Sequence, residues 1–123
     1  MAMVIHNDNG GVVEQYIARE HQVHGQRIVI DGRCMSACTI YLANPNACAT
    51  PRASFWFHSA FVGADLGGGR VAYVAEDRPT TWRMMESYPP LLKSWIQAHR
   101  PYGLTQQMLV LRGRAMFQII PRC

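Results

Sequence analysis

The sequence predicts a single α/β domain built on a mostly parallel sheet. Its length of 123 residues fits one domain. Short β-branched runs alternate with helical patterns in the order strand, glycine-rich turn, helix, strand, turn, helix, strand, which is typical of a parallel sheet with right-handed crossovers. Apolar residues make up 49% of the chain, as in ordinary globular proteins.

The first part of the chain, residues 1–60, is predicted to form the core. Its elements are a strand at 3–5, a turn at 6–11, a helix at 12–24, a strand at 27–31, a helix opened by Ser36, and two strand-like pieces around Pro51. The Asn, Asp and Gly residues of "HNDNGG" tolerate positive φ, and Gly25 is a common kind of helix stop.

The remainder divides at residue 77. Residues 61–76 contain three consecutive glycines and are predicted to be a flexible loop, a candidate lid. Residues 77–123 are predicted to be largely helical. The helices expected there begin near Pro79, end before Pro101, and resume as a short helix at 104–111; residues 115–123 are predicted as a closing strand or tail.

Several classes of function receive little support. Basic residues exceed acidic ones by four, and the arginines are scattered, so no nucleic-acid partner is expected. No apolar stretch approaches the roughly 18 residues of a membrane span, so stable membrane insertion is not expected. Cys34-x3-Cys38 lacks a matching ligand pair at zinc spacing, so neither a metal nor another cofactor is predicted.

Four cysteines, Cys34, Cys38, Cys48 and Cys123, predict two disulfides and an oxidising compartment. Three pairings are open. The short loop favours a 38–48 bond with a 34–123 bond, whereas a 34–38 bond along one helix would be poorly oriented. The first residues lack the pattern of a secretory leader, so we expect that a leader and preceding sequence were removed or that the chain is a fragment.

Three features occur in an order that suits acyl-transfer chemistry. "NGGVV" at 9–13 places a glycine pair before a helix, where backbone N–H groups can bind an anion. Ser36 opens a helix after a buried strand, and His58 follows the strand-like "SFWF", where it could act as general base. Taken singly, the three features are more often a turn, a helix cap and a strand-end residue, and it is their combination that favours a functional site.

The segments "NGGVVEQYIAREHQ", "RIVIDGRCMSACTIYL" and "TPRASFWFHSA" resemble the core of the Clp protease proteolytic subunit and crotonase superfamily. The likeness is greatest to small bacterial Clp-protease-like exported proteins. It implies a minimal or N-terminally truncated fold of that type, with ββα-type crossovers. It further implies Ser36 as nucleophile, His58 as general base, and an oxyanion hole formed by the N–H groups of Gly11 and Ala37.

The third member of the family's triad, an aspartate, has no counterpart in residues 108–118, which contain no acid. Asp65 and Asp77 are the candidate substitutes. The expected function is a serine hydrolase, of the peptidase kind, acting on a peptide or protein. The alternatives are a catalytically inactive binding or structural module, and crotonase-type thioester chemistry, against which the Ser36/His58 pair argues.

The resemblance also bears on assembly and location. The family assembles through its late helices, so a homo-oligomer is possible, and Trp82, Met84, Met85 and Trp95 are expected to form core or an oligomer contact. Together with the cysteines, the resemblance implies a periplasmic or secreted protein.

Overall fold

The computed structural model describes residues 2–123 of the chain. In order, its elements are β1 (Met3–Asp8), α1 (Val13–Val23), β2 (Ile28–Met35), the 3₁₀-helix η1 (Ser36–Ala43), β3 (Ala47–Ala49), β4 (Ser54–Phe57), β5 (Phe61–Gly67), β6 (Arg70–Glu76), α2 (Arg78–Glu86), α3 (Pro90–His99), β7 (Leu109–Arg112) and α4 (Gly113–Phe117).

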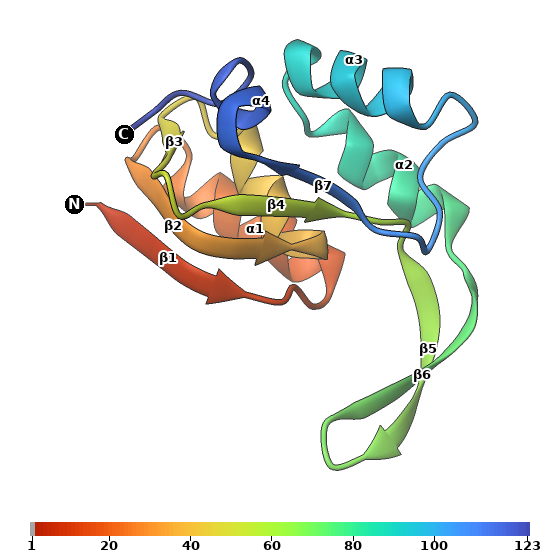
Figure 1. Ribbon diagram of the computed structural model, residues 1–123. Helices are drawn as coiled ribbons and strands as arrows, with labels where there is room; N and C mark the ends of the chain where they lie inside the picture. Colours follow the sequence, from red (N-terminus) through yellow and green to blue (C-terminus); the bar gives the residue numbers. More distant parts are fainter. Residues whose placement is uncertain (1) are drawn as a thin grey trace.

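The main sheet has the order β1-β2-β4-β7, and the short strand β3 pairs with the first half of β2 (Figure 1). Within this sheet, the pairs β1–β2, β2–β3 and β2–β4 are parallel, and the pair β4–β7 is antiparallel. The chain is therefore mixed α/β with a mostly parallel sheet, as the sequence predicts.

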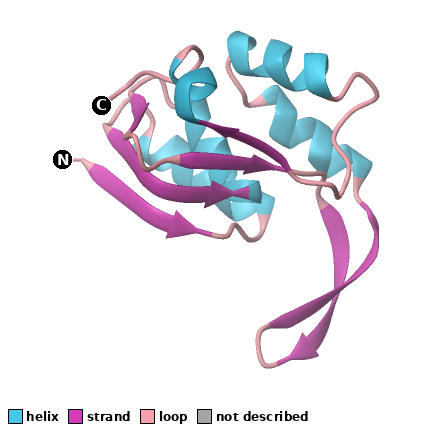
Figure 2. Cartoon of the chain, in the orientation of Figure 1, coloured by secondary structure: helices cyan, strands magenta, loops and turns pink. Residues whose placement is uncertain are grey.

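One face of this sheet forms the core. Alternate side chains of β2, β4 and β7 are buried, in keeping with the period of two along a strand: Ile28 and Ile30 from β2, Phe55 and Phe57 from β4, and Leu109 and Leu111 from β7. The helices α1 and η1 lie behind the sheet in Figure 2. Each fully buried side chain of this kind contributes about 1.5–3 kcal/mol relative to exposure, so the core fixes the strand ends that carry the site.

A glycine lets β1 approach β2 closely. The register of the pair shifts between Ile5 and Asn7, and a Cβ atom at Gly32 would coincide with the carbonyl oxygen of His6. Beyond this irregularity, Asn9 Oδ1 accepts a hydrogen bond from Arg33 Nε at 2.9 Å. The irregularity and this bond tie the turn after β1 to the end of β2.

The prediction of a flexible loop at 61–76 is wrong. β5 and β6 form an antiparallel hairpin that projects away from the body of the molecule (Figure 1). Its tip holds Gly67, Gly68 and Gly69, all with positive φ, a conformation that favours glycine. The glycine run therefore marks the tip of a hairpin, and Val71, Tyr73 and Val74 supply the β-forming residues of its second strand.

The end of the chain also differs from expectation. Residues 109–112 form β7 rather than the end of a helix, and α4 occupies part of the predicted closing strand or tail. A short apolar run such as "LVL" suits a helix or a strand equally. Pairing with β4, in which Leu109 lies opposite Phe57, decides for the strand. The two helices predicted between about Pro79 and Pro101 are confirmed as α2 and α3.

Candidate functional site

Ser36 occupies a sharp turn between β2 and η1. It is the one non-glycine residue with positive φ in the described chain, at +56°. The Thr39 hydroxyl donates to the Ser36 carbonyl oxygen at 2.6 Å and closes the turn. Because the Thr39 hydroxyl proton is used there, the buried Tyr88 hydroxyl is the donor in its 2.6 Å contact with Thr39 Oγ1. A strained residue at a strand–helix turn is the geometry in which a nucleophilic serine is often displayed.

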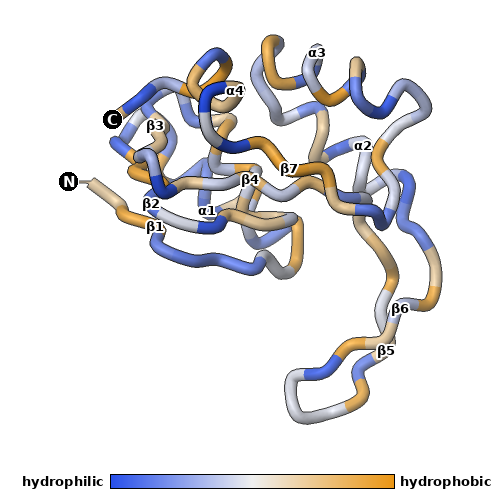
Figure 3. Tube along the Cα trace, in the orientation of Figure 1, coloured by the Kyte–Doolittle hydropathy of each residue, from blue (hydrophilic) through white to orange (hydrophobic). Residues whose placement is uncertain are grey.

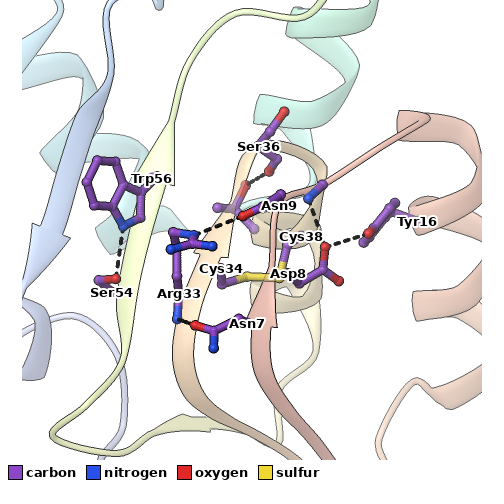
Figure 4. The surroundings of a disulfide bond; sticks show 12 residues. Asn7, Asp8, Asn9, Tyr16, Arg33, Cys34, Ser36, Cys38, Ser54 and Trp56 are labelled. Carbon is purple, nitrogen blue, oxygen red and sulfur yellow. Dashed lines mark hydrogen bonds between the residues drawn. A yellow bond between two sulfur atoms is a disulfide. The ribbon is translucent and has the colours of Figure 1, made fainter. Parts of the chain in front are cut away.

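A disulfide between Cys34 and Cys38 spans the same turn (Figure 4). This corrects the predicted pairing, because the second bond joins Cys48 to Cys123. Cys34 lies in β2 rather than on a helix with Cys38, and the chain reverses at Ser36, so the two Cα atoms are 5.3 Å apart. The Ser36 hydroxyl points away from this disulfide in Figure 4.

The glycine turn after β1 packs against the Ser36 turn. Asp8 Oδ1 accepts hydrogen bonds from Gly10 N at 2.8 Å and from the Tyr16 hydroxyl at 2.7 Å, which fixes the turn. A Cβ atom at Gly10 would lie 2.7 Å from the carbonyl oxygen of Met35 and 3.0 Å from Ala37 N. Only a glycine at position 10 therefore allows this turn to lie so close to the Ser36 turn. Burial, reinforced by Asp8, raises the pKa of Tyr16 and keeps it a donor.

This contact places the glycine turn beside Ala37, whose N–H is predicted to form the oxyanion hole together with that of Gly11. In the described residues, no hydrogen bond occupies the Gly11 N–H. The Ala37 N–H belongs to the first turn of η1, where a helix has no carbonyl of its own to offer. The Gly11 N–H is thus available to an anion beside Ser36. Ala37 is fully buried and is not among the residues that line the space beside Ser36.

His58 follows β4 and is 7% exposed. Its Nδ1 lies 2.7 Å from the carbonyl oxygen of Ser59. A carbonyl oxygen can only accept, so Nδ1 carries the proton, and in the neutral ring Nε2 keeps its lone pair. This is the tautomer that a general base requires.

The Ser59 carbonyl oxygen has a second donor. Gln106 Nε2 lies 2.9 Å from this oxygen and 2.7 Å from Ser59 Oγ. Ser59 Oγ in turn donates to Glu76 Oε1 at 3.1 Å, and Glu76 forms an ion pair with Arg78. The chain of contacts holds the Ser59 carbonyl, and through it the ring of His58, in place.

A cavity of about 440 Å³ joins these groups. Ser36, His58 and Gly11 line it together, and Phe61 and Val71 of the hairpin form an apolar part of its wall. No hydrogen bond joins Ser36 Oγ to His58 among the residues that the structure describes. The cavity therefore brings the predicted pair together around one space without direct contact between them.

The two candidate acids are placed differently. Asp65 is exposed on β5, where its Oδ1 accepts from Gly67 N at 2.8 Å, and it does not line the cavity. Asp77 lines the cavity but caps α2, accepting from Thr80 N at 3.1 Å and from Thr80 Oγ1 at 2.7 Å. Neither acid is hydrogen bonded to His58 in the described residues.

Sequence reasoning missed Ser59 and Gln106, the residues that contact the orienting group of His58. Ser59 acts through its backbone carbonyl, which any residue carries. Gln106 is 47 residues away from Ser59 in the chain, and nothing in its neighbourhood marks it. A histidine at a strand end could have suggested a hydrogen bond to the next peptide group, but it could not have identified Gln106.

No helix of residues 2–123 combines the length and the apolar character that crossing a membrane requires. The same residues contain no group of three or more His, Cys, Asp or Glu side chains arranged to hold a metal ion. The two disulfides are consistent with an oxidising, extracellular location.

No family model matches the sequence, and no curated protein matches it significantly.

Proposed function

We propose that this chain is a serine hydrolase, of the peptidase kind, with Ser36 as nucleophile and His58 as general base. The observation that carries the proposal is the placement of Ser36, the one strained non-glycine residue described, on the same cavity as a histidine whose Nε2 is left free to accept a proton. Strain of this kind costs about 1–3 kcal/mol and is concentrated at functional sites.

The chemistry follows from the groups around the cavity. Nε2 of His58 takes the proton from Ser36 Oγ while the oxygen attacks the carbonyl carbon of a bound acyl group. Negative charge develops on the carbonyl oxygen, and the N–H groups of Gly11 and Ala37 stabilise it. The protonated His58 then gives its proton to the leaving amine. Attack by water, with the same proton transfers, releases the acid and restores Ser36.

His58 has a backbone carbonyl where a triad has an acid. The Ser59 carbonyl oxygen, held by Gln106, fixes the tautomer and the orientation of the ring. A neutral carbonyl stabilises a protonated ring less than a carboxylate does. We therefore expect a slow enzyme compared with Asp-containing triads.

Contact between Ser36 and His58 is expected to form on substrate binding. Hydrogen bonds at catalytic sites are often long or unformed without substrate. Ser36 is partly exposed, and its hydroxyl points away from the Cys34–Cys38 disulfide (Figure 4).

The fold assignment, partner and compartment belong to the same proposal. A Clp-protease-like fold accounts for the order of the glycine turn, Ser36 and His58. The projecting hairpin contains hydrophobic segments (Figure 3). Its apolar side chains Val62 and Leu66 are exposed, which supports a homo-oligomer. The disulfides support a periplasmic or secreted protein.

A fluorophosphonate probe tests the proposal on the full chain with both disulfides intact. We expect covalent labelling at Ser36, loss of labelling in Ser36→Ala, and loss or strong slowing in His58→Ala. Ser94→Ala removes an exposed hydroxyl from α3 and should leave labelling unchanged. Absence of labelling in the folded protein, or labelling that persists in Ser36→Ala, would contradict the proposal.

A catalytically inactive peptide-binding module is the second candidate, and the missing Ser36–His58 hydrogen bond favours it. Such a module would retain the cavity and bind peptides without hydrolysing them. Peptides that bind saturably to a folded chain that no fluorophosphonate labels would identify it.

A further inference from the structure

A second hollow lies between α2, α3 and the segment that follows α3. Its volume is about 730 Å³, within the range of small-molecule sites. Trp82 and Met85 from α2 provide apolar surface, and the buried Leu104 from the segment after α3 also lines the hollow. Trp82 is 66% exposed and Tyr102 is 96% exposed. Large aromatic side chains that flank a concave apolar surface and remain in water commonly mark a binding site.

The charged residues of this hollow are mostly cationic. Arg78, Lys93 and Arg100 line it, and Glu86 is the one carboxylate among the lining residues. Lys93 takes part in none of the ion pairs of the described residues. The Arg100 guanidinium donates to backbone carbonyl oxygens of His99 and Met108, not to a carboxylate. The hollow thus has cations that lack an anionic partner within the described chain.

We propose that this hollow binds an amphipathic carboxylate, a molecule with an aliphatic chain and one anionic head, of the size of a medium-chain fatty acid. The head would be held by Lys93 and Arg100, because ammonium and guanidinium groups donate charge-assisted hydrogen bonds to carboxylates. The aliphatic chain would lie over Trp82 and Met85 and remove their apolar surface from water.

Size and charge favour this occupant over macromolecules. A stable protein partner needs about 1,000 Å² or more of buried surface, whereas the apolar surface here is confined to one concave hollow. A nucleic acid needs a basic stripe along the molecule, whereas the basic residues here surround an apolar floor. A single anionic head with an apolar body matches both features.

This site is separate from the Ser36 cavity, although the start of α2 borders both. Thr80 lines the cavity, and Trp82 lines the hollow. Binding of the carboxylate is therefore measurable in Ser36→Ala and does not depend on the proposed hydrolase.

Calorimetric titration of the full Ser36→Ala chain with decanoate, below its micelle-forming concentration and at low salt, tests the proposal. We expect saturable one-site binding, with decanol and acetate weaker by about tenfold or more because each lacks one of the two interactions. Lys93→Met and Trp82→Ala should each weaken decanoate binding about tenfold, and added salt should weaken it as well. Lys93 and Trp82 are exposed, so neither change should impair folding.

Arg70→Met is the matched control, since it removes one positive charge at the base of the hairpin tip, outside the hollow. It should leave decanoate binding unchanged. The proposal is overturned by an absence of saturable binding, by equal binding of decanol, or by equal weakening in Arg70→Met and Lys93→Met. It is also overturned if Trp82→Ala converts a ligand-free dimer into a monomer in sedimentation, because the hollow would then be an interface between copies.

Discussion

The Nδ1 atom of His58 donates to the carbonyl oxygen of Ser59 across 2.7 Å, so a peptide group stands where a triad would have an acid. That carbonyl depends on Gln106, whose Nε2 donates to it at 2.9 Å. The orientation of the proposed base therefore depends on a residue that does not touch the reacting atoms.

Replacement of Gln106 tests this dependence. Gln106→Met should slow fluorophosphonate labelling of Ser36 by about tenfold, a typical effect for a partner that orients a functional side chain. Gln106→Glu should be at least as slow, because a carboxylate cannot donate to the Ser59 carbonyl. Rates are measured on folded protein under pseudo-first-order conditions. Gln107→Met, an exposed neighbour, is the control; equal rates in all three variants would remove Gln106 from the mechanism.

Gly10 and Gly25 form a natural pair for a second test. Both have positive φ, +87° and +86°. A Cβ atom at Gly10 would lie 2.7 Å from the Met35 carbonyl oxygen, whereas a Cβ atom at Gly25 would have no neighbour within 4 Å. Gly25→Ala should cost about 1 kcal/mol from backbone strain alone. Gly10→Ala should cost about 2–4 kcal/mol, because the clash is added.

The same pair separates stability from function. In Gly10→Ala the glycine turn must move away from Ala37 N, so labelling of Ser36 should fall sharply. In Gly25→Ala labelling should remain as in the unaltered chain. Urea unfolding and probe labelling measure the two effects. Similar free energies of unfolding for both variants would mean that the glycine turn does not pack as described.

The strain at Ser36 predicts a reversal between two substitutions. A side chain at φ +56° is costly, so Ser36→Gly should be more stable than Ser36→Ala by about 1 kcal/mol. At Ser94 in the middle of α3 the order should be opposite, with Gly less stable than Ala by about 1 kcal/mol. Thermal or urea unfolding of the four variants tests the reversal. If the Ala variant is the more stable of the two at both positions, Ser36 is unstrained.

The stability of the chain should fall in acid through Asp31. Its carboxylate accepts from Arg52 first and from Thr50 second, which lowers its pKa from 3.8 to about 2. A lowered pKa in the folded state stabilises the protein above pH 3.8, and this contribution is lost as the pH falls toward about 2. Arg52→Met should reduce that loss, whereas Arg27→Met should not. The test is the urea concentration at the midpoint of unfolding, measured for the unaltered chain and both variants between about pH 2 and pH 4.

The sequence predicted the mixed α/β class, the helix α1 and the start of β2. It also predicted that Ser36 and His58 lie near each other, and both line one cavity, whereas Ala37 and Asp65 do not line it. β-branched runs and helical spacing locate β2 and α1, and the ends of parallel strands collect Ser36 and His58 at one place. Such local patterns fail where pairing over long distances decides the outcome. β7 is a strand because Leu109–Arg112 pairs with β4, and no local feature distinguishes it from a helix.

The disulfide pairing failed for a related reason. The sequence shows where an apolar strand begins, but β2 continues through Gly32 and Arg33 to Met35 because it is paired on both sides. That extension places Cys34 in a strand and makes a bond to Cys38 possible across the Ser36 turn. The Gln106–Ser59 contact could not be predicted either, because a hydrogen bond from a side chain to a backbone carbonyl leaves no pattern in the sequence.

The two disulfides should open in a fixed order under a native titration with reductant. Cys34 and Cys38 are fully buried, whereas Cys123 is exposed, and thiol exchange requires access to sulfur. Alkylation and peptide mass spectrometry should first find Cys48 and Cys123 modified, in a chain whose Ser36 still reacts with fluorophosphonate. Because this bond closes a separation of 75 residues, its loss should lower the free energy of unfolding by about 4–5 kcal/mol. Early alkylation of Cys34 or Cys38 in folded protein would show that the Ser36 turn opens to solvent.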